Sequence, residues 1–229
     1  HSMKPQEKTI EVGSLVLAPG FKPFDPTLYE SYGYSKFPNV VTSMEFERIL
    51  SASGPFEGHL VRPSDHKEPE KIAWLQCVGS RDLNHCDHGY CSAVCCMYAI
   101  KEAVIAKEHS AKPLDTALFF MDMRTYGKDF EKYYNRAEQE RGVRFIRSRI
   151  HSVDPVPEKD NLLIRYVTEK GEVLEEEFDM VVLSVGLETA PEALALAEKL
   201  GVPLDDNKFA KVSSFSPVSS EAPGIYACG

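Results

Sequence analysis

Residues 71–109 read KIAWLQCVGSRDLNHCDHGYCSAVCCMYAIKEAVIAKEH, and this stretch decides the fold. Its first part, residues 71–78, is a short and mostly apolar run that ends at Gly79, which is typical of a buried strand. A polar loop follows, and residues 92–109 have the composition of a helix. Strand, loop and helix in this order form the repeating unit of open α/β sheets. The stretch therefore predicts an α/β fold.

The rest of the chain continues this alternation of strands and helices. Lys170-Gly171 marks a hairpin turn between two of the strands, and Ser43 is expected to cap a helix at its N-terminus. Further strands are expected over residues 14–18, 116–121, 143–150, 161–167, 172–178 and 179–184, and helices over 43–50, 128–141 and 191–200. The pattern predicts a mainly parallel sheet with flanking helices plus an antiparallel hairpin.

Composition and charge exclude several classes of protein. The chain has 229 residues, of which 43% are hydrophobic and 27% charged, so a disordered chain is excluded. Lys and Arg number 26 against 35 Asp and Glu, for a net charge of -9, which speaks against a nucleic-acid partner bound through its phosphates. No apolar run reaches the roughly 18–20 residues of a membrane span, and no secretory signal is present. We expect a soluble, cytoplasmic protein.

Both ends have the character of boundaries within a longer protein. His1, Ser2 and Met3 resemble the remnant of an affinity tag and are left out of the fold prediction. At the other end, residues 224–229 (GIYACG) read as a short buried strand followed at once by a glycine. We therefore expect the chain to be an internal fragment, with Cys228 as a small core residue.

Five of the six cysteines lie within the stretch quoted first. A local cluster of cysteines without a signal peptide indicates metal binding or redox chemistry rather than a disulfide scaffold. Cys77 ends the strand, Cys91 precedes the helix, and Cys95 and Cys96 fall in its first turn. Because residues four apart share a helix face, we expect Cys91 and Cys95 to point the same way.

A helix N-terminus suits an anionic metal centre, since its free N–H groups and positive dipole stabilise negative charge and lower thiol pKa values. The junction also lacks the G-x-G-x-x-G that a dinucleotide needs there. Several interpretations remain open: an iron–sulfur site, a zinc site, a redox disulfide within the cluster, or ordinary buried cysteines. We favour a metal, and iron–sulfur above zinc. The iron–sulfur site would use Cys77, Cys91, Cys95 and Cys96, and the zinc site Cys86, His88, Cys91 and Cys95.

Three motifs together resemble a known family. CVGSRD at residues 77–82, YCSAVCCMYAIKEA at residues 90–103 and GIYACG at residues 224–229 look like the heterodisulfide reductase A family. Members of that family are the flavin-containing iron–sulfur subunits of heterodisulfide reductases and have a thioredoxin-reductase-like fold. The resemblance covers nearly the whole chain after residue 3. It implies an FAD/NAD(P)-binding-type α/β fold.

The resemblance also implies a domain order. Residues 4–24 would end the first half of an FAD domain, and residues 25–186 would form an NAD(P)-domain-like insert that carries the cysteines. Residues 187–229 would return toward the FAD domain. Gly20 and Gly229 would then lie on the FAD side of the molecule.

The site residues follow from the same resemblance. Cys77, Cys91, Cys95 and Cys96 would be ligands of a [4Fe–4S] cluster, and Cys86 would be a bystander. Lys101 matches a lysine near the flavin ring, against the alternative of a solvated helix lysine. Glu45 and Glu47 are further candidates for that environment, although exposed helix carboxylates are the stronger interpretation. Three arginines, Arg144, Arg147 and Arg149, are expected on the solvated face of a strand.

The function implied is electron transfer between FAD and a [4Fe–4S] cluster in an oxidoreductase. Its partners would be other heterodisulfide reductase-type subunits and electron donors or acceptors. We expect this chain by itself to be inactive and to hold FAD weakly. The alternatives are a zinc-stabilised structural or subunit-docking module, and a pyridine-nucleotide-disulfide oxidoreductase domain.

Overall fold

The computed structural model describes residues 4–228. Within them the chain forms two compact units. One, here called the cysteine unit, is continuous and comprises Pro23–Leu187. The other, here called the two-segment unit, is built from the residues up to Lys22 together with those from Glu188 onward. The tag-like residues 1–3 and Gly229 lie outside the described residues.

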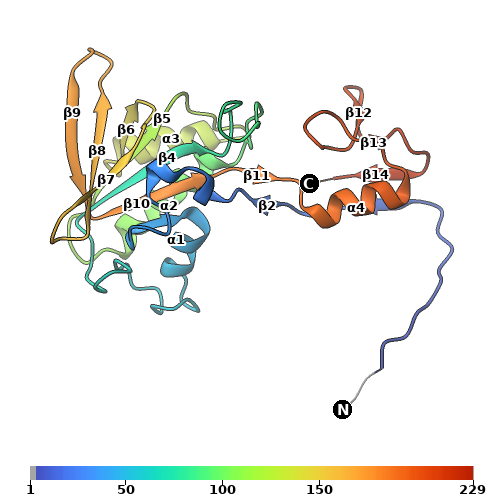
Figure 1. Ribbon diagram of the computed structural model, residues 1–229, viewed down its shortest axis with the longest axis horizontal. Coiled ribbons are helices and arrows are strands. Elements are labelled where there is room, and N and C mark those ends of the chain that lie inside the picture. Colours follow the sequence, from blue (N-terminus) through green and yellow to red (C-terminus); the bar gives the residue numbers. More distant parts are fainter. Residues whose placement is uncertain (1–3, 229) are drawn as a thin grey trace. The chain divides into compact units, whose positions relative to one another are not determined.

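A five-stranded parallel sheet forms the centre of the cysteine unit, in the order β3-β10-β4-β5-β6 (Figure 1). Its strands are β3 (Val40–Thr42), β4 (Lys71–Val78), β5 (Asp115–Phe120), β6 (Arg144–Arg147) and β10 (Met180–Val185). The three central strands are buried almost throughout, as expected of a sheet covered on both faces. The α/β fold class is confirmed.

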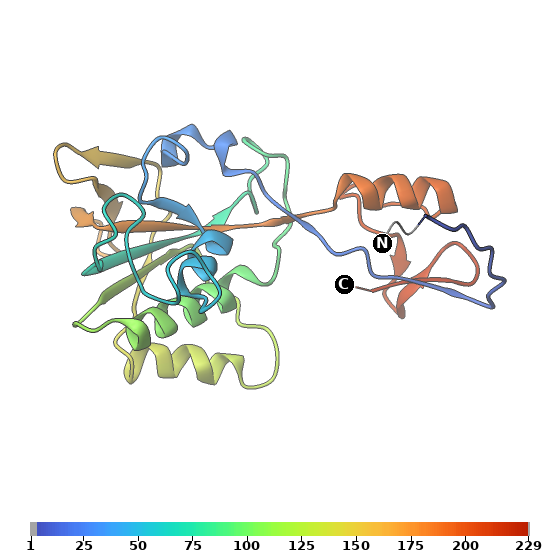
Figure 2. The same cartoon turned by 90° about the horizontal axis from the view of Figure 1, so that it is seen from below.

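One face of this sheet packs against three helices: α1 (Ser43–Leu50), α2 (Cys95–His109) and α3 (Phe130–Gln139). Figure 2 shows α2 and α3, drawn in green and yellow-green, side by side on that face. Side chains alternate between the faces of a strand, so Trp74 of β4 enters the helical layer, where its ring meets Phe46 with centroids 5.4 Å apart.

The other face packs against an antiparallel ladder of β7 (Val153–Val156), β8 (Asn161–Val167) and β9 (Val173–Phe178). Phe119 of β5 points to this side and meets Phe178 with ring centroids 5.9 Å apart. The hairpin at Lys170-Gly171 is confirmed, with Gly171 at φ +81°. The expected strand over residues 143–150 is shorter, and β7 was not predicted, because its sequence contains Pro155 and has no apolar alternation.

Helix ends follow local rules. The cap of α1 is Thr42 and not Ser43: the Thr42 hydroxyl accepts from the backbone N–H of Glu45, whose carboxylate accepts from the backbone N–H of Thr42. The expected helix over residues 92–109 begins three residues later, at Cys95, because Ala93 has a left-handed backbone with φ +62°.

The two-segment unit contains a four-stranded sheet in the order β1-β14-β13-β12 and the helix α4. The parallel pair of β1 and β14 joins the beginning and the end of the chain. Its elements are β1 (Leu15–Leu17), α4 (Pro191–Leu200), β12 (Val212–Ser213), β13 (Ser216–Ser220) and β14 (Ile225–Ala227). The prediction of buried strands here was wrong, since Val16 is 64% exposed and Cys228 is exposed as well.

Three kinds of short element complete the described fold. Two single 3-10 turns, η1 (Pro26–Leu28) and η2 (Glu30–Tyr32), occupy a segment expected to be irregular. Where the chain passes between the units, β2 (Lys22–Pro23) pairs with β11 (Leu187–Glu188).

Candidate metal centre

The four cysteines singled out in the sequence line one small cavity at the carboxyl end of the parallel sheet. Cys77 lies near the end of β4, Cys91 lies in the irregular segment before α2, and Cys95 and Cys96 are the first two residues of α2. The other lining residues are Ser80, Arg81, Ser92, Ala93, Asp122 and Arg124. Strand ends and a helix N-terminus therefore meet where open α/β sheets bind their ligands.

Backbone conformation brings these cysteines together. Cys77 has a left-handed backbone with φ +62°, which is uncommon for a residue with a Cβ atom and is typical of functional sites. The pairing of β10 with β4 shifts register between Leu183 and Val185, beside Cys77. Cys91 and Cys95 do not share a helix face, contrary to expectation, because the helix has not begun at Cys91.

Close packing supports the junction from below. The hydroxyls of Ser80 and Ser92 are 2.7 Å apart, and the Ser92 hydroxyl accepts from the backbone N–H of Leu187 at 2.9 Å. A Cβ atom on Gly186 would lie 2.4 Å from the Ser80 Oγ and 2.9 Å from the Ser92 Oγ. Only glycine therefore fits at Gly186 without displacing the two serines.

The N-terminus of α2 has no side-chain cap, since Val94 occupies the cap position. Its first backbone N–H groups are therefore free of a capping side chain and are directed at the cavity end of the helix. Cys95 contacts the carbonyl oxygen of Val185 through its Sγ at 3.7 Å, and the Tyr98 hydroxyl donates to the same oxygen at 2.7 Å.

Burial dominates the ionisation of the thiols. It raises the pKa of Cys95 to about 12 and that of Cys96 to about 11, and it also raises the pKa of Cys77. The charges of neighbouring cysteines raise all three pKa values further, which places the sulfurs within electrostatic reach of one another. The expectation of lowered thiol pKa values was wrong, because loss of hydration outweighs the helix dipole. A metal centre would have to displace these protons on binding.

The spacing of the donors suits a cluster better than a single ion. Among residues 4–228, no three Cys, His, Asp or Glu side chains come close enough together to hold one metal ion. A cluster of several irons and sulfides is larger than one ion, so its thiolate ligands stand farther apart. The free volume between the sulfurs is about 10 Å³, roughly that of one water, so the side chains must move apart to admit a cluster.

The structure does not bring together the zinc ligands considered above. Cys86 donates through its Sγ to the carbonyl oxygen of Asp82 at 3.2 Å, and the His88 Nδ1 lies 3.1 Å from the carbonyl oxygen of Gly79. Neither side chain lines the cavity of the other cysteines. The geometry therefore favours the iron–sulfur set above the zinc set.

A buried carboxylate, Asp82, organises the loop between Cys77 and Cys91. It accepts hydrogen bonds from the Tyr29 hydroxyl at 2.8 Å and from Arg149 at 2.5 Å, and lies 3.0 Å from the His85 Nδ1. The backbone N–H groups of Asn84 and His85 donate to its other oxygen. Burial opposes its ionisation, but the hydrogen bond from Tyr29 and those from the backbone hold the pKa of Asp82 below its usual range.

Sequence reasoning missed this role of Asp82, although the residue belongs to the CVGSRD motif. The expectation for the arginines was wrong in the same region. Arg149 lies beyond β6 and pairs with Asp82, and Arg144 forms ion pairs with Asp115 at 2.8 Å and Glu176 at 2.9 Å. Arg147 does lie on β6, where its side chain donates to the carbonyl oxygen of Met121.

Comparison with known proteins identifies the family. Over residues 1–229 the chain matches the family described as "Pyridine nucleotide-disulphide oxidoreductase". The chain belongs to this family. The expected enzyme class, an oxidoreductase, is confirmed by this membership.

The resemblance to heterodisulfide reductase A is also confirmed. The chain is 41% identical to the CoB–CoM heterodisulfide reductase iron–sulfur subunit of that type from Methanocaldococcus jannaschii, with 100% of this chain and 35% of that protein covered. It is 42% identical to the corresponding subunit of the H(2)/formate:CoB-CoM heterodisulfide,ferredoxin reductase of Methanococcus maripaludis, with the same two coverages, 100% and 35%. The chain thus spans about a third of the length of these relatives.

Solved structures agree on the fold of this oxidoreductase-family chain. The thioredoxin reductase of T. acidophilum superposes with a TM-score of 0.53 at 15% identity, covering 94% of this chain and 56% of that one. That of Lactococcus lactis gives a TM-score of 0.53 at 16% identity, with the same coverages of 94% and 56%. The expected thioredoxin-reductase-like fold is confirmed.

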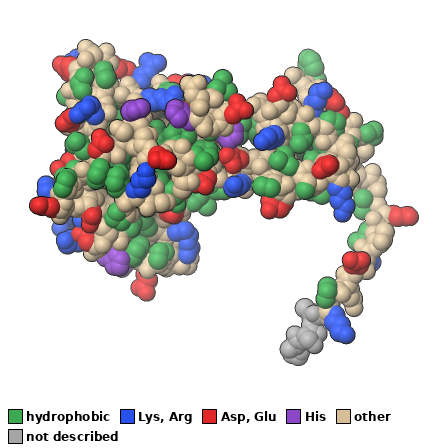
Figure 3. All heavy atoms as spheres, in the orientation of Figure 1, with side chains coloured by type: hydrophobic (Ala, Val, Ile, Leu, Met, Phe, Trp, Pro, Cys, Tyr) green, Lys and Arg blue, Asp and Glu red, His purple; other side chains and the backbone are tan. Residues whose placement is uncertain are grey.

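The surface and helices agree with a protein of mixed charge. On the face of the described residues drawn in Figure 3, acidic and basic side chains are interspersed over the cysteine unit. Among the helices of residues 4–228, none has the length and apolar composition that a membrane span requires.

The residues expected on the flavin side lie apart from the cysteine cavity. Lys101, on α2, is more than half exposed and reaches Glu47 of α1 at 4.0 Å. Glu45 is engaged in the cap of α1. Gly20 has φ +74° and open space where a Cβ would stand, so only its backbone conformation favours glycine. Gly229 lies outside the described residues.

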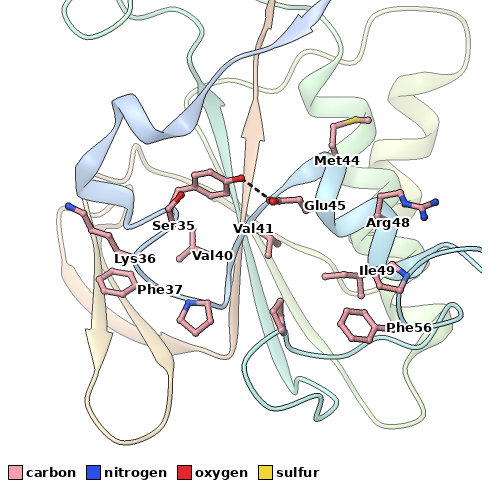
Figure 4. Close-up of a pocket in the computed structure, with 14 residues that line it drawn as sticks. Ser35, Lys36, Phe37, Val40, Val41, Met44, Glu45, Arg48, Ile49 and Phe56 are labelled. Carbon is pink, nitrogen blue, oxygen red and sulfur yellow. Dashed lines mark hydrogen bonds between the residues drawn. The ribbon is translucent and has the colours of Figure 1, made fainter.

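A second and larger cavity, of about 690 Å³, lies beside α1 and β3 and contains none of the cysteines. Figure 4 shows its apolar wall, which includes Phe37, Val41 and Phe56. The one hydrogen bond drawn there joins the Tyr34 hydroxyl to Glu45 Oε1 at 3.0 Å.

Proposed function

We propose that this chain is the cluster-bearing module of a heterodisulfide reductase A-like oxidoreductase, and that it transfers electrons between FAD and a [4Fe–4S] cluster. One observation carries the proposal: Cys77, Cys91, Cys95 and Cys96 line a single cavity at the strand-to-helix junction. Four thiolates are the usual donor set of such a cluster. The assignment is supported by a relative, 41% identical over the whole chain, that is named as an iron–sulfur subunit.

A bound [4Fe–4S] cluster would supply a one-electron acceptor and donor. Cys77 would hold it from the sheet, Cys91 from the loop, and Cys95 and Cys96 from α2. The uncapped N-terminus of α2 would direct its N–H groups toward the negative charge. Asp82 would keep the loop between Cys77 and Cys91 in place through the hydrogen bonds described above.

FAD would be held mainly by the two-segment unit and by residues beyond this chain. In this proposal residues 4–24 and 187–229 belong to the FAD side, with Gly20 and Gly229 near the cofactor, and residues 25–186 form the insert. Lys101 is proposed to face the flavin ring, with Glu47 as its neighbour. The partners would be other subunits of a heterodisulfide reductase-type complex, since the relatives are named as its subunits.

The test is metal and sulfide analysis with a visible spectrum after anaerobic reconstitution. About four irons and four sulfides per chain are expected, with a broad absorption that is lost on reduction. Cys95→Ser should lower the iron content by removing a ligand. Cys86→Ser is the matched control, because its sulfur lies outside the cavity and should leave the iron content unchanged.

Two other results would contradict the proposal. One zinc per chain without sulfide, lost in Cys86→Ser, would establish the zinc-stabilised module in its place. Tight NADH binding with reversible formation of a disulfide within the cysteine cluster would establish a pyridine-nucleotide-disulfide oxidoreductase domain.

A further inference from the structure

Three charged side chains stand at the rim of the cysteine cavity, and they are all the charged residues among those that line it. Arg81 follows β4, and Asp122 and Arg124 follow β5. Asp122 pairs with Arg81 through one carboxylate oxygen and accepts from the Arg124 Nε through the other at 3.1 Å. The set carries two positive charges and one negative charge, so its net charge is about +1.

This rim acts directly on the sulfurs. The Arg81 guanidinium favours the thiolate form of Cys77 through its charge and a side-chain hydrogen bond, although burial outweighs both. The backbone N–H of Arg124 favours the thiolate form of Cys96 in the same way. Asp122 has the opposite effect, since its carboxylate disfavours negative charge on Cys77 and Cys96.

The same charges bear on any electron that enters the site. Reduction adds one negative charge to a cluster, and a fixed positive charge a few ångströms away stabilises the reduced form. The side chains of Arg81 and Arg124 are 23% and 30% exposed, so water screens them only in part. The effect of Arg81 is reduced, but not cancelled, by Asp122.

We propose that Arg81 and Asp122 form a pair of opposed charges that sets the reduction potential of the cysteine-bound centre, Arg81 raising it and Asp122 lowering it. This inference rests on the proposed function and adds to it the residues that tune the site. Neither residue touches the reacting electron carrier as a ligand. They act through the sulfur environment and are positioning residues.

The experiment is a redox titration of the anaerobically reconstituted chain with dithionite and mediators, followed by EPR and visible absorption. Arg81→Gln should lower the ratio of reduced to oxidised cluster at a fixed potential by about tenfold, equivalent to 59 mV for one electron. Asp122→Asn should raise that ratio by a similar factor, since it leaves Arg81 and Arg124 uncompensated. Arg81→Lys keeps the charge and should retain most of the original potential.

Arg165→Gln is the matched control. It removes the same charge from an exposed site on β8, where Arg165 pairs with Glu175, and should not change the potential. If Arg81→Gln prevents assembly, Asp122→Asn decides the matter, because it leaves Arg81 in place.

The outcomes separate this inference from the one on which it rests. Intact clusters whose potentials are equal in Asp122→Asn and the unchanged chain, or lower in the variant, overturn the inference while leaving the proposed function standing. Failure of the unchanged chain to assemble any cluster overturns the proposed function, and the tuning role with it. Opposite shifts in the two variants, with none in the control, support it.

Discussion

Replacing Asp82 by Asn tests whether one buried carboxylate holds the cysteine loop in place. Asp82 is 4% exposed and accepts hydrogen bonds from Tyr29, Arg149 and two backbone N–H groups, with His85 also in contact. An Asn side chain has one acceptor oxygen in place of two and no charge. It can therefore satisfy the backbone donors or the side-chain donors, but not both.

The cost follows from the environment of each partner. The Tyr29 hydroxyl is buried, and a hydrogen bond to a charged group contributes roughly 1.5–3 kcal/mol. The Arg149 side chain is 48% exposed, so water screens this ion pair and its contribution is about 1 kcal/mol or less. Asp82→Asn should therefore lower the free energy of unfolding by about 3 kcal/mol at pH 7.

The pH dependence fixes the sign. The pKa of Asp82 is lower in the folded chain than the value of about 3.9 expected when unfolded. Its stabilising effect is thus present above pH 4 and is lost as the pH falls through the folded-state pKa. The difference between the unchanged chain and the variant should be constant above about pH 5 and should shrink below about pH 4.

Urea unfolding followed by circular dichroism, in the presence of a thiol reductant, measures this difference at pH 7 and pH 3.5. Asp154→Asn, which removes an exposed carboxylate from β7, is the control and should change stability by less than about 0.5 kcal/mol. A difference for Asp82→Asn that is equally large at both pH values would refute the electrostatic argument. A difference below 1 kcal/mol at pH 7 would refute the role of the network.

Two further predictions concern the core beneath the site. Gly186→Ala should lower the free energy of unfolding by about 1–3 kcal/mol and reduce iron uptake, since its Cβ would meet the Ser80 Oγ at 2.4 Å; thermal unfolding and iron analysis measure both, and Gly142→Ala, where nothing lies within 4 Å of the added Cβ, controls for backbone strain at a glycine. Glu102→Gln should stabilise the chain more at pH 8 than at pH 5, because burial raises the pKa of Glu102, so that the carboxyl costs more folding free energy as the pH rises above the unfolded-state value of about 4.3. Melting temperatures that change equally at pH 5 and pH 8 would contradict this.

Local sequence determined most of the elements. The bounds of β4, β8 and α4 follow from apolar runs and from glycine or proline at their ends, which act over a few residues. The motif with Cys91, Cys95 and Cys96 was sufficient to predict a cysteine site and the family, because those residues are neighbours in sequence. Even here the start of α2 was placed three residues early, since the left-handed backbone at Ala93 has no sequence signal.

Only the tertiary structure decided what surrounds those cysteines. Cys77 reaches the others because β4 and β10 pair in a register that no single segment specifies. Asp82 meets Tyr29 and Arg149 across 53 and 67 residues of chain, and Arg81 meets Asp122 across 41. Burial, which reverses the expected direction of the thiol pKa shifts, is likewise a property of the packed layers. Composition and spacing specify which groups are present, whereas packing sets their distances and their exclusion from water, and these control charge.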